Sequence, residues 1–212
     1  IALGLRNHGA SPHAEGMSYA AMAGDVLETL EAMAALPCRL VGHSMGGKVA
    51  MMAALTRPQA VARLVVADIA PVAYPPRLRG YLAAMRAVAL APGLTRAAAD
   101  AALQGEVAEA AVRGFLLQSL VPGAAPRWKL GLAEIDAAMP EIEGWAAPAG
   151  ADYAGPVLFV AGGRSVYIRA EDRGAIRALF PAARFVVLRR AGHWLHADDP
   201  QGFLEVLTAA LE

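Results

Sequence analysis

Apolar residues along the chain form two alternating patterns, short continuous runs and longer stretches with helical spacing. Short, mainly apolar runs that predict strands occur at residues 39–41, 63–69, 156–161 and 183–188, and the nearly continuous run at 63–69 is typical of a strand buried on both faces of a sheet. Stretches that predict helices alternate with these runs, at residues 19–36, 47–55, 171–179 and 200–211. Strands and helices in this order predict an α/β fold with a mostly parallel sheet flanked by helices.

The alternation is interrupted once, in the middle of the chain. Residues 1–5 form a short apolar run that ends at a polar turn, which predicts the end of a first strand. Between Pro71 and about Pro148 only alanine-rich helical stretches are predicted, and no strand. We therefore expect a core domain formed by residues 1–70 and 151–212, with a helical cap inserted over residues 71–150.

The pentapeptide Gly42-His43-Ser44-Met45-Gly46 lies between a predicted strand and a predicted helix. A serine at such a junction stands on a sharp turn, where glycines two residues to either side leave space for the backbone. Free N–H groups at the helix N-terminus favour a developing oxyanion. We therefore predict that Ser44 is a nucleophile and that the Met45 amide is an oxyanion-hole donor. The alternative is a glycine-rich turn with a solvated serine.

A nucleophilic serine needs a base, which is in turn oriented by an acid. His193 follows the predicted strand 183–188 directly, so we expect it at the same sheet edge as Ser44 and predict that it is the base. His196 is the weaker candidate, with a structural role at the start of the last helix as its alternative. For His43, packing or hydrogen bonding within the turn is favoured. His8 is either a pocket residue or a plain turn residue.

The candidate acid is Asp68, which ends the predicted strand 63–69 beside the serine turn. Glu171 and Asp172 are weaker candidates, because the loop after residues 156–161 holds no earlier carboxylate. The alternative role for Asp68 is a turn cap before Pro71.

These residues resemble the α/β-hydrolase superfamily, and in particular its small bacterial carboxylesterase/thioesterase branch, which shares motifs with mammalian abhydrolase-domain esterases. The resemblance is carried by the segments at residues 5–9, 41–48, 66–71, 113–117 and 191–197. It implies that the acid has moved to Asp68 and that Ser165 occupies the more usual position of the acid. It also implies a cap over the active-site mouth and a substrate pocket lined by His43, Leu116, Leu117 and Trp194, with core packing as the alternative for the leucines and the tryptophan.

Members of that branch begin with further strands, one of which ends in a His-Gly loop that supplies a second oxyanion-hole N–H. By this resemblance the chain starts within the fourth strand, with Gly4 where an aspartate is usual. We therefore expect a fragment of a longer gene product that lacks the N-terminal strands and this loop.

Composition narrows the possible functions further. Hydrophobic residues make up 57% of the chain and charged residues 18%, and the 19 basic residues balance the 19 acidic ones. This balance provides no electrostatic footprint for nucleic acid or anionic membranes. No apolar stretch approaches the roughly 18 residues of a membrane span. Cys38 is the only cysteine and no signal peptide is visible, so we expect a cytoplasmic protein.

Together these observations predict a serine hydrolase of small-molecule carboxylic esters or thioesters that uses neither a cofactor nor a metal. Two alternatives remain. One is a catalytically impaired fragment or a non-catalytic ligand-binding protein of the same fold. The other is a cofactor-free perhydrolase or C–C hydrolase, because relatives run such chemistry with the same triad.

Overall fold

The computed structural model describes residues 1–212, which divide into two compact units. One unit, here called the sheet unit, comprises Ser18–Ala73 and Gly144–Glu212. The other, here called the helical unit, comprises Ile1–Met17 and Tyr74–Glu143. Each is described by itself.

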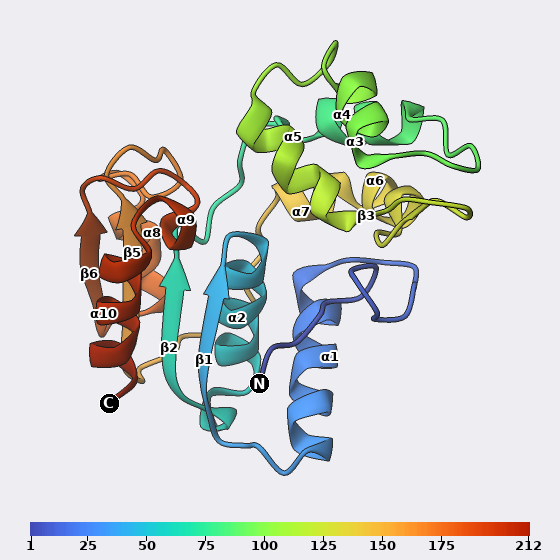
Figure 1. Ribbon diagram of the computed structural model, residues 1–212. Coiled ribbons are helices and arrows are strands. Elements are labelled where there is room, and N and C mark those ends of the chain that lie inside the picture. Colours follow the sequence, from blue (N-terminus) through green and yellow to red (C-terminus); the bar gives the residue numbers. More distant parts are fainter. The chain divides into compact units, whose positions relative to one another are not determined.

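A four-stranded sheet forms the centre of the sheet unit (Figure 1). Its strands, in spatial order, are β1 (Cys38–His43), β2 (Val61–Ala67), β5 (Val157–Gly162) and β6 (Ala183–Leu188). Every neighbouring pair is parallel. The predicted α/β class with a mostly parallel sheet is therefore confirmed.

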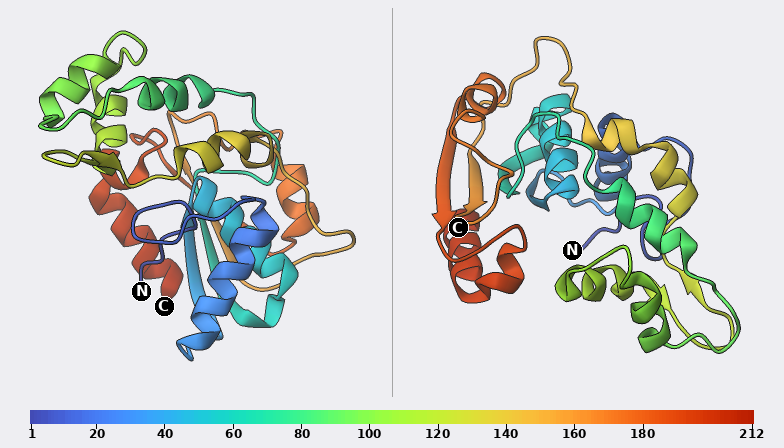
Figure 2. Two further views of the ribbon diagram at one scale, coloured as in Figure 1. Left: turned by 90° about the vertical axis from the view of Figure 1, so that its right-hand side faces the viewer. Right: turned by 90° about the horizontal axis from the view of Figure 1, so that it is seen from above.

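Helices cover both faces of this sheet (Figure 2). On one face lie α2 (Met45–Thr56) and α8 (Arg173–Leu179), with Gly47 of α2 close to Val66 of β2. On the other face, α9 (Leu195–Asp198) and α10 (Pro200–Leu211) pack on a cluster that includes Val65 and Val160. Because side chains alternate along a strand, consecutive apolar residues of β2 are buried against different helices.

Helix α2 is the most deeply buried helix of the sheet unit. Every residue from Gly47 to Leu55 is buried, because α2 lies between the sheet and α1 (Tyr19–Ala32). This burial explains why the helix segment is apolar on all sides rather than on one stripe. It also includes one charged residue, Lys48, whose side chain is buried.

The predicted boundaries of the first helix were too long. Helix α1 begins after Ser18, whose hydroxyl oxygen accepts a hydrogen bond from the Ala21 amide, and it ends at Ala32 rather than at residue 36. Ala34 has a φ of 52°, in the left-handed region, which a continuing α-helix does not allow.

The helical unit consists of short helices and one small antiparallel sheet. Its helices are α3 (Arg79–Ala87), α4 (Arg96–Leu103), α5 (Ala110–Leu116), α6 (Leu132–Ala137) and α7 (Met139–Glu143). Strands β3 (Leu120–Val121) and β4 (Arg127–Trp128) pair with each other, although no strand was predicted between Pro71 and Pro148. Strands of two residues are too short to produce an alternating pattern in the sequence.

The strand predicted at residues 1–5 does not form. A strand needs a ladder of hydrogen bonds to a neighbour, whereas this segment uses its carbonyl groups in local turns. The Ser11 hydroxyl donates to the Gly4 carbonyl oxygen, and the His8 amide donates to that of Leu5. Residues 1–5 therefore do not pair with β1, which is an edge strand of the sheet.

Residues 1–17 instead join the helical unit, chiefly through Asn7. This residue is fully buried, with a φ of 64°, and its side-chain amide exchanges two hydrogen bonds with the backbone of Ala14. Its carbonyl oxygen accepts from the Gly131 amide, and the Gly9 amide donates to the Lys129 carbonyl oxygen. The first segment is thus tied to residues 129–131.

No helix in the structure combines the length and the apolar composition that crossing a membrane requires.

Candidate active site

Ser44 stands between the end of β1 and the first residue of α2, with a φ of 53° and a ψ of −124°. A non-glycine residue in this backbone region costs on the order of 1–3 kcal/mol, so the surrounding contacts must hold it there. The Ser44 amide donates to the Ala67 carbonyl oxygen at 3.0 Å. Its own carbonyl oxygen accepts from the amides of Gly47 and Lys48. The turn is therefore fixed on both sides by backbone hydrogen bonds.

Two glycines make this tight turn possible, Gly42 and Gly47. The sequence predicted Gly42 and Gly46 for this role. A Cβ atom on Gly42 would lie 2.2 Å from the Gly46 carbonyl oxygen, so only a hydrogen fits. A Cβ atom on Gly46 would meet nothing within 4 Å, and the expectation for this position was wrong. The second crowded glycine is Gly47, where a Cβ would lie 2.6 Å from Ile69 Cγ2. The reason is that α2 turns Gly47, and not Gly46, towards β2.

A chain of hydrogen bonds joins the three residues that were predicted as nucleophile, base and acid. His193 Nε2 lies 3.0 Å from Ser44 Oγ, and His193 Nδ1 lies 2.8 Å from Asp68 Oδ2. Because a carboxylate only accepts, the bond to Asp68 assigns the ring proton to Nδ1. Nε2 is then left as an acceptor for the Ser44 hydroxyl proton.

The strand ends of the parallel sheet bring these residues together. Ser44 follows β1, Asp68 follows β2, and His193 lies in the loop between β6 and α9. In a parallel sheet these carboxyl ends lie at one edge. In this way His193 comes within hydrogen-bond distance of Ser44 and Asp68, which precede it by 149 and 125 residues in the sequence.

The Asp68 carboxylate is fully buried and accepts three hydrogen bonds. Besides His193 Nδ1, its donors are the Gly162 amide, at 2.9 Å, and the Ser165 hydroxyl. Such charge-assisted bonds offset the cost of removing a carboxylate from water. The weaker candidates, Glu171 and Asp172, are instead bonded to Arg169 and not to His193.

Two further rings lie close to the imidazole of His193. The Tyr167 ring centroid lies 4.1 Å from that of the imidazole, with planes tilted by 30°, and the Tyr167 amide donates to Ser165 Oγ. Sequence reasoning missed Tyr167, because a tyrosine in the loop after β5 has no feature that marks this contact. The His43 ring centroid lies 4.8 Å from that of His193.

His43 supports the backbone of His193 and not the hydroxyl of Ser44. Its Nε2 donates to the His193 carbonyl oxygen at 2.7 Å. Burial lowers the pKa of His43 below its ordinary value. The His196 ring packs edge-on against His43 at 5.6 Å.

The remaining predicted residues lie in different parts of the chain. Met45 is the first residue of α2, where the amide has no partner within the helix, and Trp194 precedes α9. Leu116 and Leu117 belong to the helical unit, in which Leu117 is 2% exposed and forms part of the core. The assignment of His43, Leu116, Leu117 and Trp194 to a substrate pocket stays a prediction.

No group of three or more histidine, cysteine or acidic side chains is arranged to hold a metal ion.

Lys48 is a buried charged residue in helix α2. The Lys48 side chain is 1% exposed, its Nζ donates to the Gly144 carbonyl oxygen at 2.7 Å, and it lies 5.2 Å from the centre of the Tyr19 ring. Burial lowers the pKa of Lys48 to about 8.

A hydroxyl bonded to an imidazole, which is bonded to a buried carboxylate, is the arrangement that activates serine for attack on an acyl carbon. Set at the carboxyl edge of a parallel sheet on a strand–turn–helix, it defines the α/β-hydrolase class. The chain belongs to the alpha/beta hydrolase family, whose family model matches residues 1–206. The family predicted from the sequence motifs is therefore confirmed.

Several relatives in this family carry esterase or lipase names. The chain is 41% identical to the sn-1-specific diacylglycerol lipase ABHD11 of Mus musculus, over all of this chain and 71% of the relative. It is 37% identical to the esterase YbfF of Escherichia coli, over 98% of this chain and 80% of the relative. Among solved structures, a marine microorganism esterase superposes with a TM-score of 0.93 at 33% identity, covering 98% of this chain and 82% of the esterase.

The contacts of the two turn glycines lead to a first prediction. Gly42→Ala is expected to lower the free energy of unfolding by about 3 kcal/mol, because the new methyl group meets backbone that cannot move aside. Gly46→Ala is the matched control and should stay within about 1 kcal/mol of the parent chain. Urea unfolding measures both, and equal stabilities for the two variants would contradict the turn geometry.

The buried Lys48 leads to a prediction about pH. The folded chain releases the Lys48 proton near pH 8, while the unfolded chain keeps it to about 10.5, the ordinary value. Between these values the unfolded state binds more protons, so the contribution of Lys48 to stability rises with pH. Unfolding free energies measured at pH 7.5 and 9.5 should therefore show a rise that Lys48→Met reduces. The control is Lys129→Met at the exposed second lysine, which should leave the rise unchanged.

Proposed function

We propose that this protein hydrolyses carboxylic esters through an acyl-enzyme formed on Ser44. The observation that carries the proposal is the continuous hydrogen-bond chain from Ser44 Oγ through His193 to Asp68, all within the sheet unit. The esterase and lipase names of the relatives support the same class of reaction.

In the first half-reaction, Ser44 Oγ attacks the acyl carbon of the ester while its proton moves to His193 Nε2. The imidazole becomes a cation, which the Asp68 carboxylate stabilises through the Nδ1–H bond. Collapse of the tetrahedral intermediate breaks the bond to the leaving alcohol, which takes the proton from Nε2. The acyl group then remains on Ser44.

The second half-reaction repeats these steps with water. His193 Nε2 removes a proton from the water as its oxygen attacks the acyl carbon, and the proton is returned to Ser44 Oγ as the acid leaves. In both steps the Met45 amide at the N-terminus of α2 is the proposed donor to the oxyanion, where the helix dipole adds further stabilisation.

The substrate proposed is a small molecule with a carboxylic ester bond, and a thioester is the second candidate bond. The relatives named as esterases and as a diacylglycerol lipase favour the oxygen ester. The same Ser44 chemistry acts on a thioester, so the two substrates are compared directly in the test below.

The nucleophile is tested by Ser44→Ala. Hydrolysis of a p-nitrophenyl ester and of the matching thioester should fall by at least about 10³-fold, and covalent labelling by a fluorophosphonate should disappear. Thr208→Ala, which removes an exposed hydroxyl of α10, should leave both unchanged. Unaltered labelling of Ser44→Ala would refute the proposal. Labelling of the parent chain at Ser44 without turnover would support the impaired or non-catalytic alternative.

The acid is tested by comparing Asp68→Asn with Ser165→Ala. An asparagine carries no charge to stabilise the imidazolium, and its NH2 group can donate to Nδ1 and shift the ring proton to Nε2, so kcat should fall by about 10³-fold or more. Ser165→Ala removes one of the donors to Asp68 and should cost about tenfold or less, because the Gly162 amide still holds the carboxylate. A kcat for Asp68→Asn within tenfold of the parent would exclude Asp68 as the acid.

A further inference from the structure

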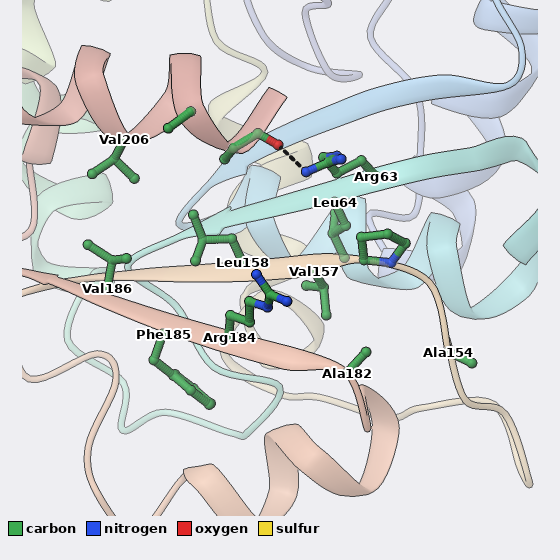
Figure 3. A pocket seen from close by; sticks show the side chains of 13 residues that line it. Arg63, Leu64, Ala154, Val157, Leu158, Ala182, Arg184, Phe185, Val186 and Val206 are labelled. Atoms are coloured by element: carbon green, nitrogen blue, oxygen red, sulfur yellow. Dashed lines mark hydrogen bonds between the residues drawn. The ribbon is translucent and has the colours of Figure 1, made fainter. Parts of the chain in front are cut away.

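A pocket of about 700 Å³ lies in the sheet unit, away from Ser44 (Figure 3). It is formed between α10 and the sheet, with Leu158 of β5, Val186 of β6 and Val206 of α10 among its lining residues. None of the residues of α10 is fully buried, and Leu204 is 60% exposed. This helix therefore covers its face of the sheet incompletely. A volume of this size lies within the range of small-molecule sites.

Two arginines line the same pocket, Arg63 of β2 and Arg184 of β6. The sheet register aligns Val65, Leu158 and Arg184 across β2, β5 and β6. Arg63 precedes Val65 by two residues, so both arginine side chains leave the sheet on the face that α10 covers. One strand, β5, separates them, and with the offset of two residues along the strand their backbones lie roughly 12 Å apart.

Neither guanidinium group has a carboxylate partner within the 4.0 Å of an ion pair, as no salt bridge involves Arg63 or Arg184. Arg63 Nη1 donates to the Ala210 carbonyl oxygen at 2.9 Å, which orients the group and leaves its other donors available. Arg39, the register partner of Arg63 on β1, adds a third positive charge at this end of the same face. The local charge therefore favours an anion.

The two kinds of lining residue are separated in space. In Figure 3, Val186 and Val206 lie on one side of Leu158, while Arg63 and Arg184 lie on the other. An apolar end and a cationic end match a molecule with an aliphatic tail and an anionic head. The planar guanidinium group is suited to a carboxylate, which it can bind through two parallel hydrogen bonds.

We propose that this pocket binds an aliphatic carboxylate, with the head group between Arg63 and Arg184 and the tail along Leu158, Val186 and Val206. The site lies near the start of β2 and β6, whereas Ser44, Asp68 and His193 follow the strand ends. From Arg63 to Asp68 the chain advances by five residues, which corresponds to about 16 Å along a β-strand. The proposal therefore does not depend on hydrolysis by Ser44.

The test uses the full chain and sodium decanoate as the probe. Decanoate should shift the methyl NMR signals of Leu158, Val186 and Val206 saturably, with little effect on the His193 ring signals. Arg184→Gln and Arg63→Gln should each raise the dissociation constant by about tenfold, since each removes charge-assisted bonds to the carboxylate. Arg189→Gln, at an exposed arginine beyond β6, should leave it unchanged.

Two comparison probes separate the head group from the tail. Acetate lacks the tail and decanol lacks the charge, so both should bind at least tenfold more weakly than decanoate to the parent chain. The proposal is overturned if decanoate shifts only signals near His193, if no saturable binding occurs, or if binding is insensitive to Arg63→Gln and Arg184→Gln. All of these readouts are independent of whether the chain turns over an ester.

Discussion

The buried carboxylate of Asp68 is the interaction on which the candidate site depends. It accepts three hydrogen bonds. The donors are the amide of Gly162 at the end of β5, the hydroxyl of Ser165 in the following loop, and the imidazole of His193 in the loop after β6. Because it only accepts, it determines where the ring proton of His193 lies. The orientation of the base towards Ser44 is therefore set by a group at the end of the central strand β2.

Much of this arrangement could be predicted from the sequence, because strand ends in a parallel sheet meet at one edge. A residue that directly follows the apolar run of such a strand therefore lies at this edge of the sheet. This is why Ser44, Asp68 and His193 were named together, although their catalytic roles stay predictions. The elements that were predicted best are β6 and α10, and α10 begins at a proline, Pro200.

Other features depend on contacts that no local pattern encodes. Residues 1–5 have the composition of a strand, yet strand formation requires a neighbour, and their hydrogen bonds go to a local turn. The crowded glycine at position 47 rather than 46 follows from the angle at which α2 meets β2. Tyr167 meets His193 only because two loops from different strands converge. The bond from Lys48 to the Gly144 carbonyl oxygen and its position over the Tyr19 ring join residues far apart in the sequence.

The chain passes between its two units three times, after residues 17, 73 and 143, and this has a consequence for biosynthesis. Ser44 and Asp68 leave the ribosome well before His193, which belongs to the last segment of the sheet unit. A nascent chain would carry the strained serine turn before β5 pairs with β2 and before β6 pairs with β5. The assembled hydrogen-bond chain thus belongs to the finished polypeptide, and a partly synthesised one holds the serine without its base.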